Sequence, residues 1–426
     1  MHYFAYKGRA PRELHAEDVA LRAIADAVGT PTYVYSAATL RRHYQVVDSA
    51  FGRRPHLVCY SVKANSNLAV LSLLAREGSG FDIVSGGELF RVLQAGGDPG
   101  RVVFSGVGKS ELEIGAALDA GILAFNVESG EELDAVARIA RLRRKVAPVA
   151  LRVNPAIDPR THRHIATGLR RSKFGIPVER AAELYRSRRR VRSLRFVGVD
   201  CHIGSQLTQL DPLRRAVALA ASLYRTLLAE GLPMQYLDVG GGLGITYVEE
   251  RPPSPLEYAT AVVEALGDVP ATVVAEPGRV LVGNAGLLLA RVLYRKEEGD
   301  RRFVVVDAGM NDLIRPALYG AHHEVVPVRE APARKVAVDV VGPVCESADV
   351  LARARRLPAL AAGDLLAVMS AGAYGMSMAS SYNSRPRPAE VLVEGSRFLV
   401  ARDRESYQDL VRGERAGPAG RRRRRR

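Results

Sequence analysis

The sequence predicts an α/β protein in which a (β/α)8 TIM barrel is followed by a separate, mainly-β C-terminal domain. Between residues 56 and 276, short apolar runs alternate with stretches whose apolar residues recur at helical spacing. We find eight such runs, and eight parallel strands close a TIM barrel. After residue 280, extended runs follow one another without helices between them, which favours a separate β domain.

The elements follow in chain order. The predicted barrel strands are 56–63, 80–85, 102–107, 123–128, 147–154, 194–204, 235–240 and 271–276. The clearest helices between them are 68–77, 131–144 and 213–230. The β domain is predicted from runs at 285–294, 303–307, 334–341, 364–370 and 390–402, with a hairpin turn at Glu394–Arg397. We therefore divide the chain into an N-terminal segment that packs with the β domain (1–32), the barrel (33–280), the β domain (281–412) and a basic, disordered tail (413–426).

Composition limits the class of protein. The 426 residues with 47% hydrophobic content suffice for two domains with cores. The net charge of +15 comes mainly from arginine and includes Arg421–Arg426 at the end of the chain. Such a run is typical of a solvated tail. Binding of nucleic acid through it stays an alternative, but no binding motif accompanies it, so no nucleic-acid partner is expected.

The cellular location is predicted from cysteines and hydropathy. Three cysteines, Cys59, Cys201 and Cys345, form an odd, sparse set that favours a reducing compartment. The first residues show no apolar signal segment, and no apolar stretch reaches the length of a membrane span. We therefore expect a cytoplasmic protein without a membrane partner.

Polar residues follow the predicted barrel strands, where barrel enzymes place their active sites. Lys63 ends the first strand, where partial desolvation would make its amine lose a proton more readily and form a Schiff base with an aldehyde. A lysine that simply reaches solvent is the alternative. The other strand ends carry Asp82, Arg152, Asn154, His202–Gln206, Asp238–Gly242 and Glu276–Arg279.

The glycine run Gly240–Gly244 is predicted to bind phosphate. It fails the G-x-G-x-x-G fingerprint because Ile245 occupies the sixth position. Glycine N–H groups that bind a phosphate fit better, and a plain tight turn is the alternative. A phosphate site beside a Schiff-base lysine suggests pyridoxal 5′-phosphate. Glu276 is the candidate partner of its ring nitrogen. His202 is the candidate for its ring face, unless it is a core histidine.

Several long motifs carry a family resemblance. They are Tyr60–Asn65, Phe81–Glu88, Ser172–Gly175, His202–Ser205, Gly240–Gly242, Glu276–Arg279, Asp312–Tyr319, Gly342–Asp349 and Gly372–Gly375. Over roughly residues 30–410, the sequence resembles the fold-type III decarboxylases that use pyridoxal phosphate, which have an alanine-racemase-like barrel. Among them it is most similar to the diaminopimelate decarboxylases.

The resemblance implies roles for particular residues. Lys63 is expected to bind the cofactor covalently, and Cys345 is expected to protonate the carbanion as general acid. The implied cofactor-binding residues are Lys63, Asp82, His202, Ser205, Gly240, Gly241, Gly242, Glu276, Gly278, Arg279 and Tyr374. The implied substrate-binding residues are Arg279, Arg315, Tyr319, Glu346 and Tyr374. In this family Cys345 and Glu346 come from the partner subunit, so a homodimer with shared active sites is implied. No metal site is expected.

The expected reaction is decarboxylation of meso-2,6-diaminopimelate to L-lysine and CO2, the last step of lysine biosynthesis. Arg279 and Arg315 suit the distal carboxylate, and Glu346 suits the distal ammonium. A decarboxylase of ornithine or lysine would need only an acid, and buried arginines without a carboxylate would then be costly. The alternatives are a relative with another substrate, such as an ornithine or arginine decarboxylase, and a non-enzymatic carrier of the cofactor.

Overall fold

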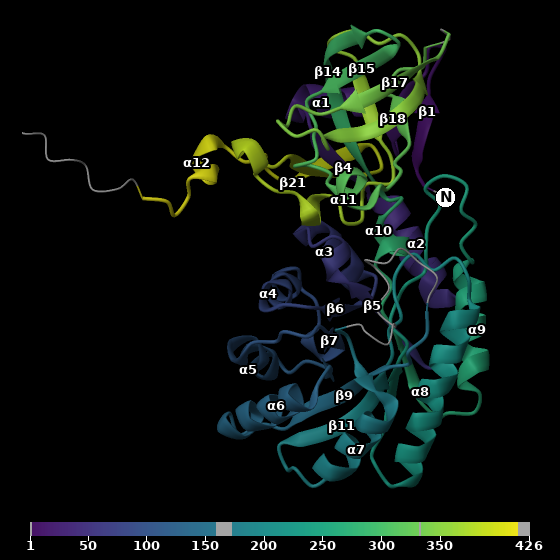
Figure 1. Ribbon diagram of the computed structural model, residues 1–426, viewed down its shortest axis with the longest axis vertical. Coiled ribbons are helices and arrows are strands. Elements are labelled where there is room, and N and C mark those ends of the chain that lie inside the picture. Colours follow the sequence, from purple (N-terminus) through teal and green to yellow (C-terminus); the bar gives the residue numbers. More distant parts are fainter. Residues whose placement is uncertain (1, 159–172, 332–333, 416–426) are drawn as a thin grey trace, which may run out of the picture.

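The computed structural model describes residues 2–158, 173–331 and 334–415. Figure 1 shows two bodies, a barrel surrounded by helices and a β domain that lies over one end of it. Two features of the sequence analysis fall outside the described residues, namely Ser172 and the arginine run Arg421–Arg426.

The barrel closes with the eight strands that the sequence predicts. Its strands are β5 (His56–Ser61), β6 (Gly80–Ile83), β7 (Val102–Phe104), β8 (Ala124–Val127), β9 (Ala147–Asn154), β11 (Leu194–Asp200), β12 (Tyr236–Asp238) and β13 (Thr272–Ala275). All neighbours are parallel, and β13 pairs with β5 to complete the cylinder. A two-residue strand, β10 (Ile176–Pro177), is added beside β9. The TIM barrel is confirmed, although most strands end earlier than predicted because the chain turns into the loops that carry the site.

Helices cover the outside of the barrel (Figure 1). They are α2 (Ala37–Ser49), α3 (Leu68–Arg76), α4 (Gly86–Gln94), α5 (Glu111–Ala120), α6 (Gly130–Leu142), α7 (Val178–Arg188), α8 (Asp211–Ala229), α9 (Pro255–Leu266) and α10 (Arg279–Val282), with 3-10 turns at Val62–Ala64 and Pro99–Arg101. Their ends follow sequence signals. Ser110 and Glu113 form a capping box at the start of α5, and Gly121 closes it in the left-handed conformation. The last helix, α10, is only one turn long, which the sequence did not indicate.

The β domain is a second large sheet. Its strands are β14 (Gly286–Glu298), β15 (Arg301–Val306), β16 (Val325–Pro327), β17 (Val336–Val341), β18 (Val350–Leu357), β19 (Leu365–Val368), β20 (Ala389–Glu394) and β21 (Arg397–Arg402). The hairpin predicted at Glu394–Arg397 joins β20 to β21. Two strands, β16 and β18, were not predicted. Short helical turns also interrupt the extended runs, namely α11 (Arg315–Tyr319), Met376–Met378, Tyr382–Ser384 and α12 (Tyr407–Leu410).

The N-terminal segment lies against the β domain. It forms β1 (Phe4–Lys7), β2 (Glu13–Ala16), β3 (Val19–Ala20) and α1 (Leu21–Val28). Phe4 and Leu14 share an apolar cluster with Leu287 and Val391 of the large sheet. The next strand, β4 (Thr32–Ser36), pairs with β14 and β20. The domain boundaries remain a proposal, and the pairing of β4 favours a first boundary after β4 rather than after residue 32.

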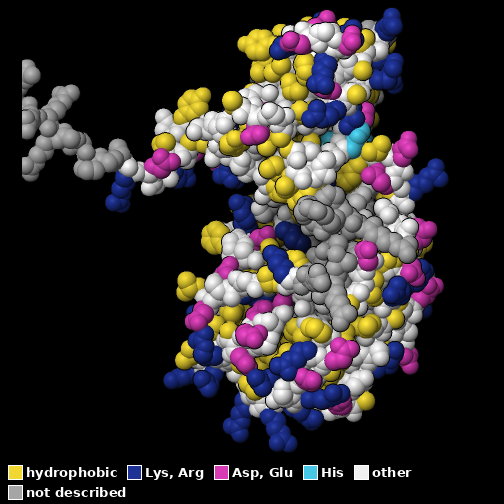
Figure 2. Space-filling view, in the orientation of Figure 1, with side chains coloured by type: hydrophobic (Ala, Val, Ile, Leu, Met, Phe, Trp, Pro, Cys, Tyr) yellow, Lys and Arg dark blue, Asp and Glu magenta, His cyan; other side chains and the backbone are white. Residues whose placement is uncertain are grey.

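The surface reflects the arginine-rich composition. Figure 2 shows basic side chains scattered over the visible face, several of them at the end of the barrel remote from the β domain. Among the residues that the structure describes, no helix is both long and apolar enough to cross a membrane.

Candidate active site

One buried polar residue from the end of each barrel strand points into the mouth of the barrel. Below this level the interior is filled by small apolar residues, among them Cys59, Val103, Ala124 and Val274. Because side chains alternate along a strand, a residue two positions further on faces the same way. Two positions beyond these four residues lie Ser61, Ser105, Asn126 and Glu276. At or near the ends of the other four strands lie Asp82, Arg152, Asp200 and Asp238. All eight residues are polar and buried, and we call them the polar ring.

The polar ring is joined by side-chain hydrogen bonds. The Ser61 hydroxyl donates to Asp82 Oδ2 over 2.7 Å. The Asn126 amide lies within 3.0 Å of Asp238 Oδ2 and 3.4 Å of Glu276 Oε1. The Ser105 hydroxyl is 3.3 Å from the same Glu276 oxygen. Glu276 is thereby held in place by neutral donors.

The polar ring carries more acids than bases. Four carboxyl groups face one guanidinium, because Arg152 is the only base in the ring. Burial, together with the charge of Asp238, raises the pKa of Glu276 well above its usual value. Burial raises the pKa of Asp238 to about 6, against the lowering effect of its hydrogen bonds to Gly240 and Asn126. The mouth of the barrel is thus built to receive a positively charged group.

Lys63 lies at the rim of the polar ring. It sits in the 3-10 turn after β5, with its Nζ 2.5 Å from Asp82 Oδ2 and its side chain 35% exposed. Burial lowers the pKa of Lys63, but the charges of Asp82 and Glu276 outweigh that effect, so the net shift is upward. The expectation of a more readily lost proton was therefore wrong for the protein without cofactor, since the sequence showed the burial but not the facing acids.

The glycine loop after β12 is shaped by close contacts. A Cβ on Gly240 would lie 2.3 Å from His202 Nδ1, and one on Gly241 would lie 2.0 Å from the Glu276 carbonyl oxygen. The Gly240 N–H donates to Asp238 Oδ1, and the Gly241 N–H donates to His202 Nδ1. Two of the N–H groups predicted to bind phosphate therefore have protein partners, and the glycines are needed at least as much for close packing.

His202 is fixed by the same loop. Because its Nδ1 accepts from Gly241, the neutral ring carries its proton on Nε2. Burial lowers the pKa of His202 well below its usual value, and the positive charges of Arg152 and Lys63 add to this effect. His202 is thus a neutral, oriented aromatic ring.

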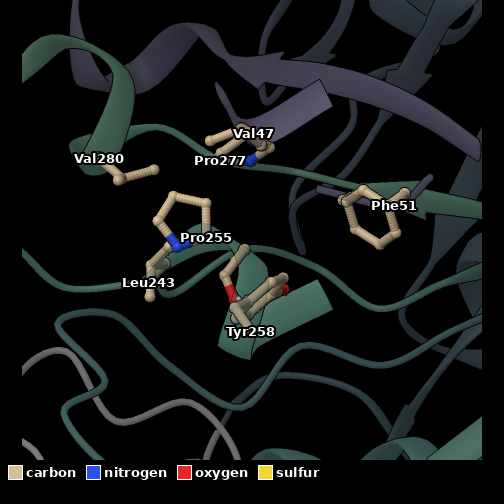
Figure 3. A pocket seen from close by; sticks show the side chains of 9 residues that line it. Val47, Phe51, Leu243, Pro255, Tyr258, Pro277 and Val280 are labelled. Carbon is tan, nitrogen blue, oxygen red and sulfur yellow. Dashed lines mark hydrogen bonds between the residues drawn. The ribbon is translucent and has the colours of Figure 1, made fainter. Parts of the chain in front are cut away.

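An apolar pocket lies behind the glycine loop. It is lined by Val47, Phe51, Gly241, Leu243, Pro255, Tyr258, Ala275, Pro277 and Val280. Figure 3 shows the labelled apolar side chains surrounding it, with Tyr258 at one side. The Tyr258 hydroxyl reaches the carbonyl oxygens of Gly240 and Gly241, at 3.3 and 3.4 Å. The residues that line this pocket therefore support the glycine loop from behind, and none of them is a candidate for the chemical reaction.

Two buried arginines gather where the barrel meets the β domain. Arg279 begins α10 and Arg315 begins α11. The Arg279 Nη1 donates to the Tyr247 hydroxyl over 2.7 Å, and the Arg315 guanidinium lies 4.8 Å from the centre of the Tyr247 ring. Arg315 Nη1 is 3.0 Å from His323 Nε2. We call Arg279, Arg315, Tyr247 and His323 the arginine cluster.

The arginine cluster contains no acid. Within the described ranges, neither guanidinium has a carboxylate within ion-pairing distance, although Arg279 is 6% and Arg315 is 5% exposed. Burial lowers the pKa of Arg315, and the neighbouring Arg279 lowers it further. Buried charges without a partner are costly. The cluster is therefore suited to a ligand that brings its own negative charge.

The other predicted site residues fall into two groups. Ser205 and Tyr374 lie beside Arg279, with Ser205 Oγ 3.3 Å from Arg279 Nη2 and the Tyr374 ring 5.0 Å from the guanidinium. The Tyr374 N–H also donates to the Ala64 carbonyl, next to Lys63. Gly278 packs on the end of β5, where an added Cβ would lie 3.0 Å from the Cβ of Ser61. Ser205, Tyr374 and Gly278 therefore lie close to Arg279 or to the end of the strand that leads to Lys63.

Cys345 and Glu346 lie apart from this group. Both are exposed on the loop before β18, as expected for a loop tip. Their hydrogen bonds involve the 380–384 region: the Cys345 N–H donates to Asn383, and Glu346 accepts from Tyr382. Tyr319 is half-buried at the end of α11. Among the described residues, no hydrogen bond or ion pair joins Cys345 or Glu346 to Lys63.

The residues at the mouth fit pyridoxal phosphate. Asp82 Oδ1 is buried without a hydrogen-bond partner, and three of the ring's acids have raised pKa values, so a protonated pyridine nitrogen would relieve their mutual repulsion. Lys63 supplies the amine for an aldehyde. A cofactor with a cationic ring and an aldehyde matches this set of groups.

Part of the site was not predicted from the sequence. Asn126 and Ser105 each stand alone in an apolar strand, and only their common spacing from inward-facing apolar residues would have revealed them. Tyr247 lies seven residues after Gly240 in a loop, and His323 lies eight residues after Arg315. No periodicity links these two to the site, since a fold must bring them there.

Comparisons with known proteins agree with this site. The family described as "Pyridoxal-dependent decarboxylase, pyridoxal binding domain" matches residues 37–283. The fold and site are thus those of a barrel enzyme that uses pyridoxal phosphate.

Relatives are similar over nearly the whole chain. Diaminopimelate decarboxylase of Pseudomonas aeruginosa is 52% identical over 414 residues, covering 97% of this chain and 99% of that protein. The crystal structure of diaminopimelate decarboxylase from Helicobacter pylori complexed with L-lysine is 43% identical with a TM-score of 0.89, covering 92% of this chain and 98% of that one. The diaminopimelate decarboxylase structure from M. jannaschi has a TM-score of 0.92 at 36% identity, covering 98% of both chains. The chain belongs to the diaminopimelate decarboxylase family of pyridoxal-dependent enzymes.

Proposed function

We propose that this chain decarboxylates meso-2,6-diaminopimelate to L-lysine and CO2, the last step of lysine biosynthesis. The arginine cluster is the observation that carries the proposal. Two buried guanidiniums without an acid suit a substrate that keeps a carboxylate after CO2 has left. Diaminopimelate has such a carboxylate at its far end. The name of the P. aeruginosa relative and the L-lysine bound to the H. pylori relative support the same reaction.

The chain's residues would hold the cofactor between the polar ring and the arginine cluster. Lys63 Nζ would be the covalent attachment point, and Asp82 would keep the free amine oriented. Glu276 would hold a proton at the ring nitrogen, while the neutral His202 would lie against the ring face. When bound, pyridoxal phosphate supplies an aldehyde for the substrate amine and a ring that accepts the electron pair left by CO2.

The phosphate would lie near the glycine loop and α10. Because the N–H groups of Gly240 and Gly241 have protein partners, we assign the phosphate to Gly242, Ser205 and the turn at Gly278–Arg279. Tyr374 would close the site from the β domain, since its loop is hydrogen bonded to the turn of Lys63.

The charged groups at the substrate's far end would be bound by side chains of opposite charge. Arg279, Arg315 and Tyr319 would bind the distal carboxylate, and Glu346 would bind the distal ammonium. Ornithine and lysine lack the second carboxylate and would leave both arginines unpaired, which favours diaminopimelate over them.

The activity is tested by turnover. Purified holoenzyme should release CO2 from meso-diaminopimelate and form L-lysine in equal amounts, with little CO2 from ornithine or lysine. A preference for ornithine would replace this proposal with the alternative of a diamine-forming decarboxylase. Loaded cofactor without turnover on any of these substrates would favour a carrier instead.

We further propose that the active enzyme is a homodimer in which Cys345 and Glu346 reach the partner's site. Their exposure on a loop in the single chain supports this arrangement. Cys345 would return a proton to the substrate carbon, which requires its thiol to face a site closed to water.

Mixed dimers test this arrangement. Lys63→Ala and Cys345→Ala should each be inactive alone. After unfolding and refolding together, half of the dimers are mixed and each of those has one intact site, so about a quarter of wild-type activity should return. No recovery would contradict sharing of the site.

The unpaired state of all three cysteines in the described residues also supports a reducing compartment, and we propose the cytoplasm.

A further inference from the structure

Tyr247 and His323 occupy the space between and behind the two arginines of the arginine cluster. Tyr247 belongs to the barrel loop after β12, and His323 follows α11 in the β domain. Their rings meet edge to face, with centroids 5.5 Å apart. Neither residue belongs to a motif that the sequence analysis connected with substrate or cofactor.

Tyr247 contacts both guanidiniums in different ways. Its hydroxyl accepts from Arg279 Nη1 at 2.7 Å, whereas its ring face lies 4.8 Å from the Arg315 guanidinium. Arg279 also approaches the ring, with its guanidinium carbon 5.9 Å from the ring centre, so one rigid side chain contacts both cations. Tyr247 therefore fixes the spacing and tilt of two cations that would otherwise repel each other.

The backbone of Tyr247 is itself held. Its N–H donates to Glu250 Oε2 over 2.9 Å, and that oxygen also accepts from the Val248 N–H. The Glu250 carboxylate is thus engaged with the backbone of its own loop, and it positions the tyrosine without pairing with either arginine.

His323 orients Arg315 from the other side. His323 is fully buried, and its Nδ1 lies 2.9 Å from the Met369 carbonyl oxygen. A carbonyl oxygen only accepts, so Nδ1 carries the proton and the unprotonated Nε2 accepts from Arg315 Nη1 at 3.0 Å. Burial and the charge of Arg315 lower the pKa of His323 to about 3, so the ring is neutral at physiological pH.

Neutrality of both supports has a consequence for specificity. An aspartate or glutamate in either place would orient an arginine equally well, but it would neutralise the charge and compete with a carboxylate ligand. A phenol and a neutral imidazole fix the guanidiniums while leaving their charge available.

We propose that Tyr247 and His323 are positioning residues that set the arginine pair for the carboxylate that remains on the product. This inference rests on the proposed function, because the ligand is taken to be the far carboxylate of diaminopimelate and of L-lysine. The two residues act through Arg279 and Arg315 and touch no reacting atom.

The test compares two amines that differ only in that carboxylate. L-lysine carries it, and cadaverine, the same chain without it, does not. Each amine is titrated into holoenzyme and its binding is followed by the change in cofactor absorbance. The wild type should bind L-lysine at least about tenfold more tightly than cadaverine, because a charge-assisted hydrogen bond is worth about 1.5–3 kcal/mol.

Three variants separate the contacts. Tyr247→Phe removes the hydroxyl but keeps the ring, and His323→Leu removes the acceptor of Arg315. Each should weaken L-lysine binding about tenfold and raise KM for meso-diaminopimelate by a similar factor, with cadaverine binding and kcat nearly unchanged. His323→Gln keeps an acceptor and should recover part of the loss.

The neighbouring histidine provides a matched control. His322 contacts Arg355 and is outside the arginine cluster, so His322→Leu should leave the L-lysine to cadaverine ratio unchanged. Equal weakening of both amines in Tyr247→Phe, or no weakening of L-lysine, would overturn the inference. If His323→Leu does not fold, Tyr247→Phe decides alone. A wild type that shows no preference for L-lysine and no turnover of diaminopimelate would instead contradict the proposed function.

Discussion

The polar ring and the arginine cluster have opposite charge characters within one site. The polar ring holds four carboxyl groups and a single guanidinium, with Lys63 at its rim. The arginine cluster holds two guanidiniums, a phenol and a neutral imidazole, without an acid in ion-pairing distance in the part of the chain described. Each region is costly without a group of opposite charge, because like charges are buried together.

This contrast explains how one site orients two ligands. A cationic ring nitrogen is attracted to the acidic ring, and a carboxylate is attracted to the cluster of arginines. The barrel supplies the whole of the first region from its strand ends. The second lies at the junction with the β domain, since Arg315 and His323 come from that domain. We therefore propose that the barrel carries the chemistry and that the domain junction carries recognition of the substrate's far end.

The largest expected effect comes from Lys63. Lys63→Ala removes the amine that we propose as the attachment point of the cofactor, so CO2 release should fall by about a thousandfold or more, and the visible absorbance of the bound cofactor should be lost. Lys63→Arg keeps a cation beside Asp82 but supplies no suitable nucleophile, so it should be folded and equally inactive. Substantial activity in either variant would remove Lys63 from the reaction.

Arg315→Ala should be next in size. Removal of one partner of a buried charge pair costs about 2–5 kcal/mol, so kcat/KM for meso-diaminopimelate should fall by about thirtyfold or more. Residual turnover of lysine, which offers no second carboxylate, should change little. A parallel loss on both substrates would mean that Arg315 supports the fold rather than recognition.

Glu276→Gln should affect the rate more than binding. An amide cannot hold a mobile proton at the ring nitrogen, so kcat should fall by about a hundredfold, in the range expected for a proton-handling group. The variant should still bind cofactor, because Lys63 is intact. Rates equal to those of the wild type would show that the acid excess of the polar ring has no catalytic purpose.

The smallest effect concerns stability and pH in protein freed of cofactor. Burial raises the pKa of Asp238 from 3.8 to about 6, so the folded state binds this proton more tightly than the unfolded state. Stability from this group should therefore fall as pH rises from about 4 to about 6 and stay level above that. Relative to Asp238→Asn, the wild type should lose about 1–3 kcal/mol over this range. If the urea midpoints of the two proteins change with pH in the same way, the raised pKa of Asp238 is contradicted.

Much of the fold could be predicted from the sequence, because barrel strands buried on both faces read as apolar runs. β18 lacks such an apolar run and was therefore missed. It lies at the edge of its sheet and carries arginines at exposed positions. β16 is three residues long and ends in proline, so it gives no period to detect. Both failures concern strands with little burial.

The site was predictable where it follows strand ends. Lys63, Asp82 and Glu276 meet because parallel strands bring their carboxyl ends to one mouth. Tyr247 and His323 were not predictable, since their meeting depends on how the β domain packs over the barrel. The sign of the Lys63 pKa shift was mistaken because a strand shows its own burial but not the acids facing it from neighbouring strands.

The covalent site of the cofactor provides the most direct test. Holoenzyme is reduced with borohydride, digested, and its lysine-containing peptides are identified by mass spectrometry. The account predicts a phosphopyridoxyl group on Lys63, and on no other lysine in more than trace amounts. A stoichiometric label on a different lysine would place the chemistry away from the polar ring and contradict the assignment of both regions.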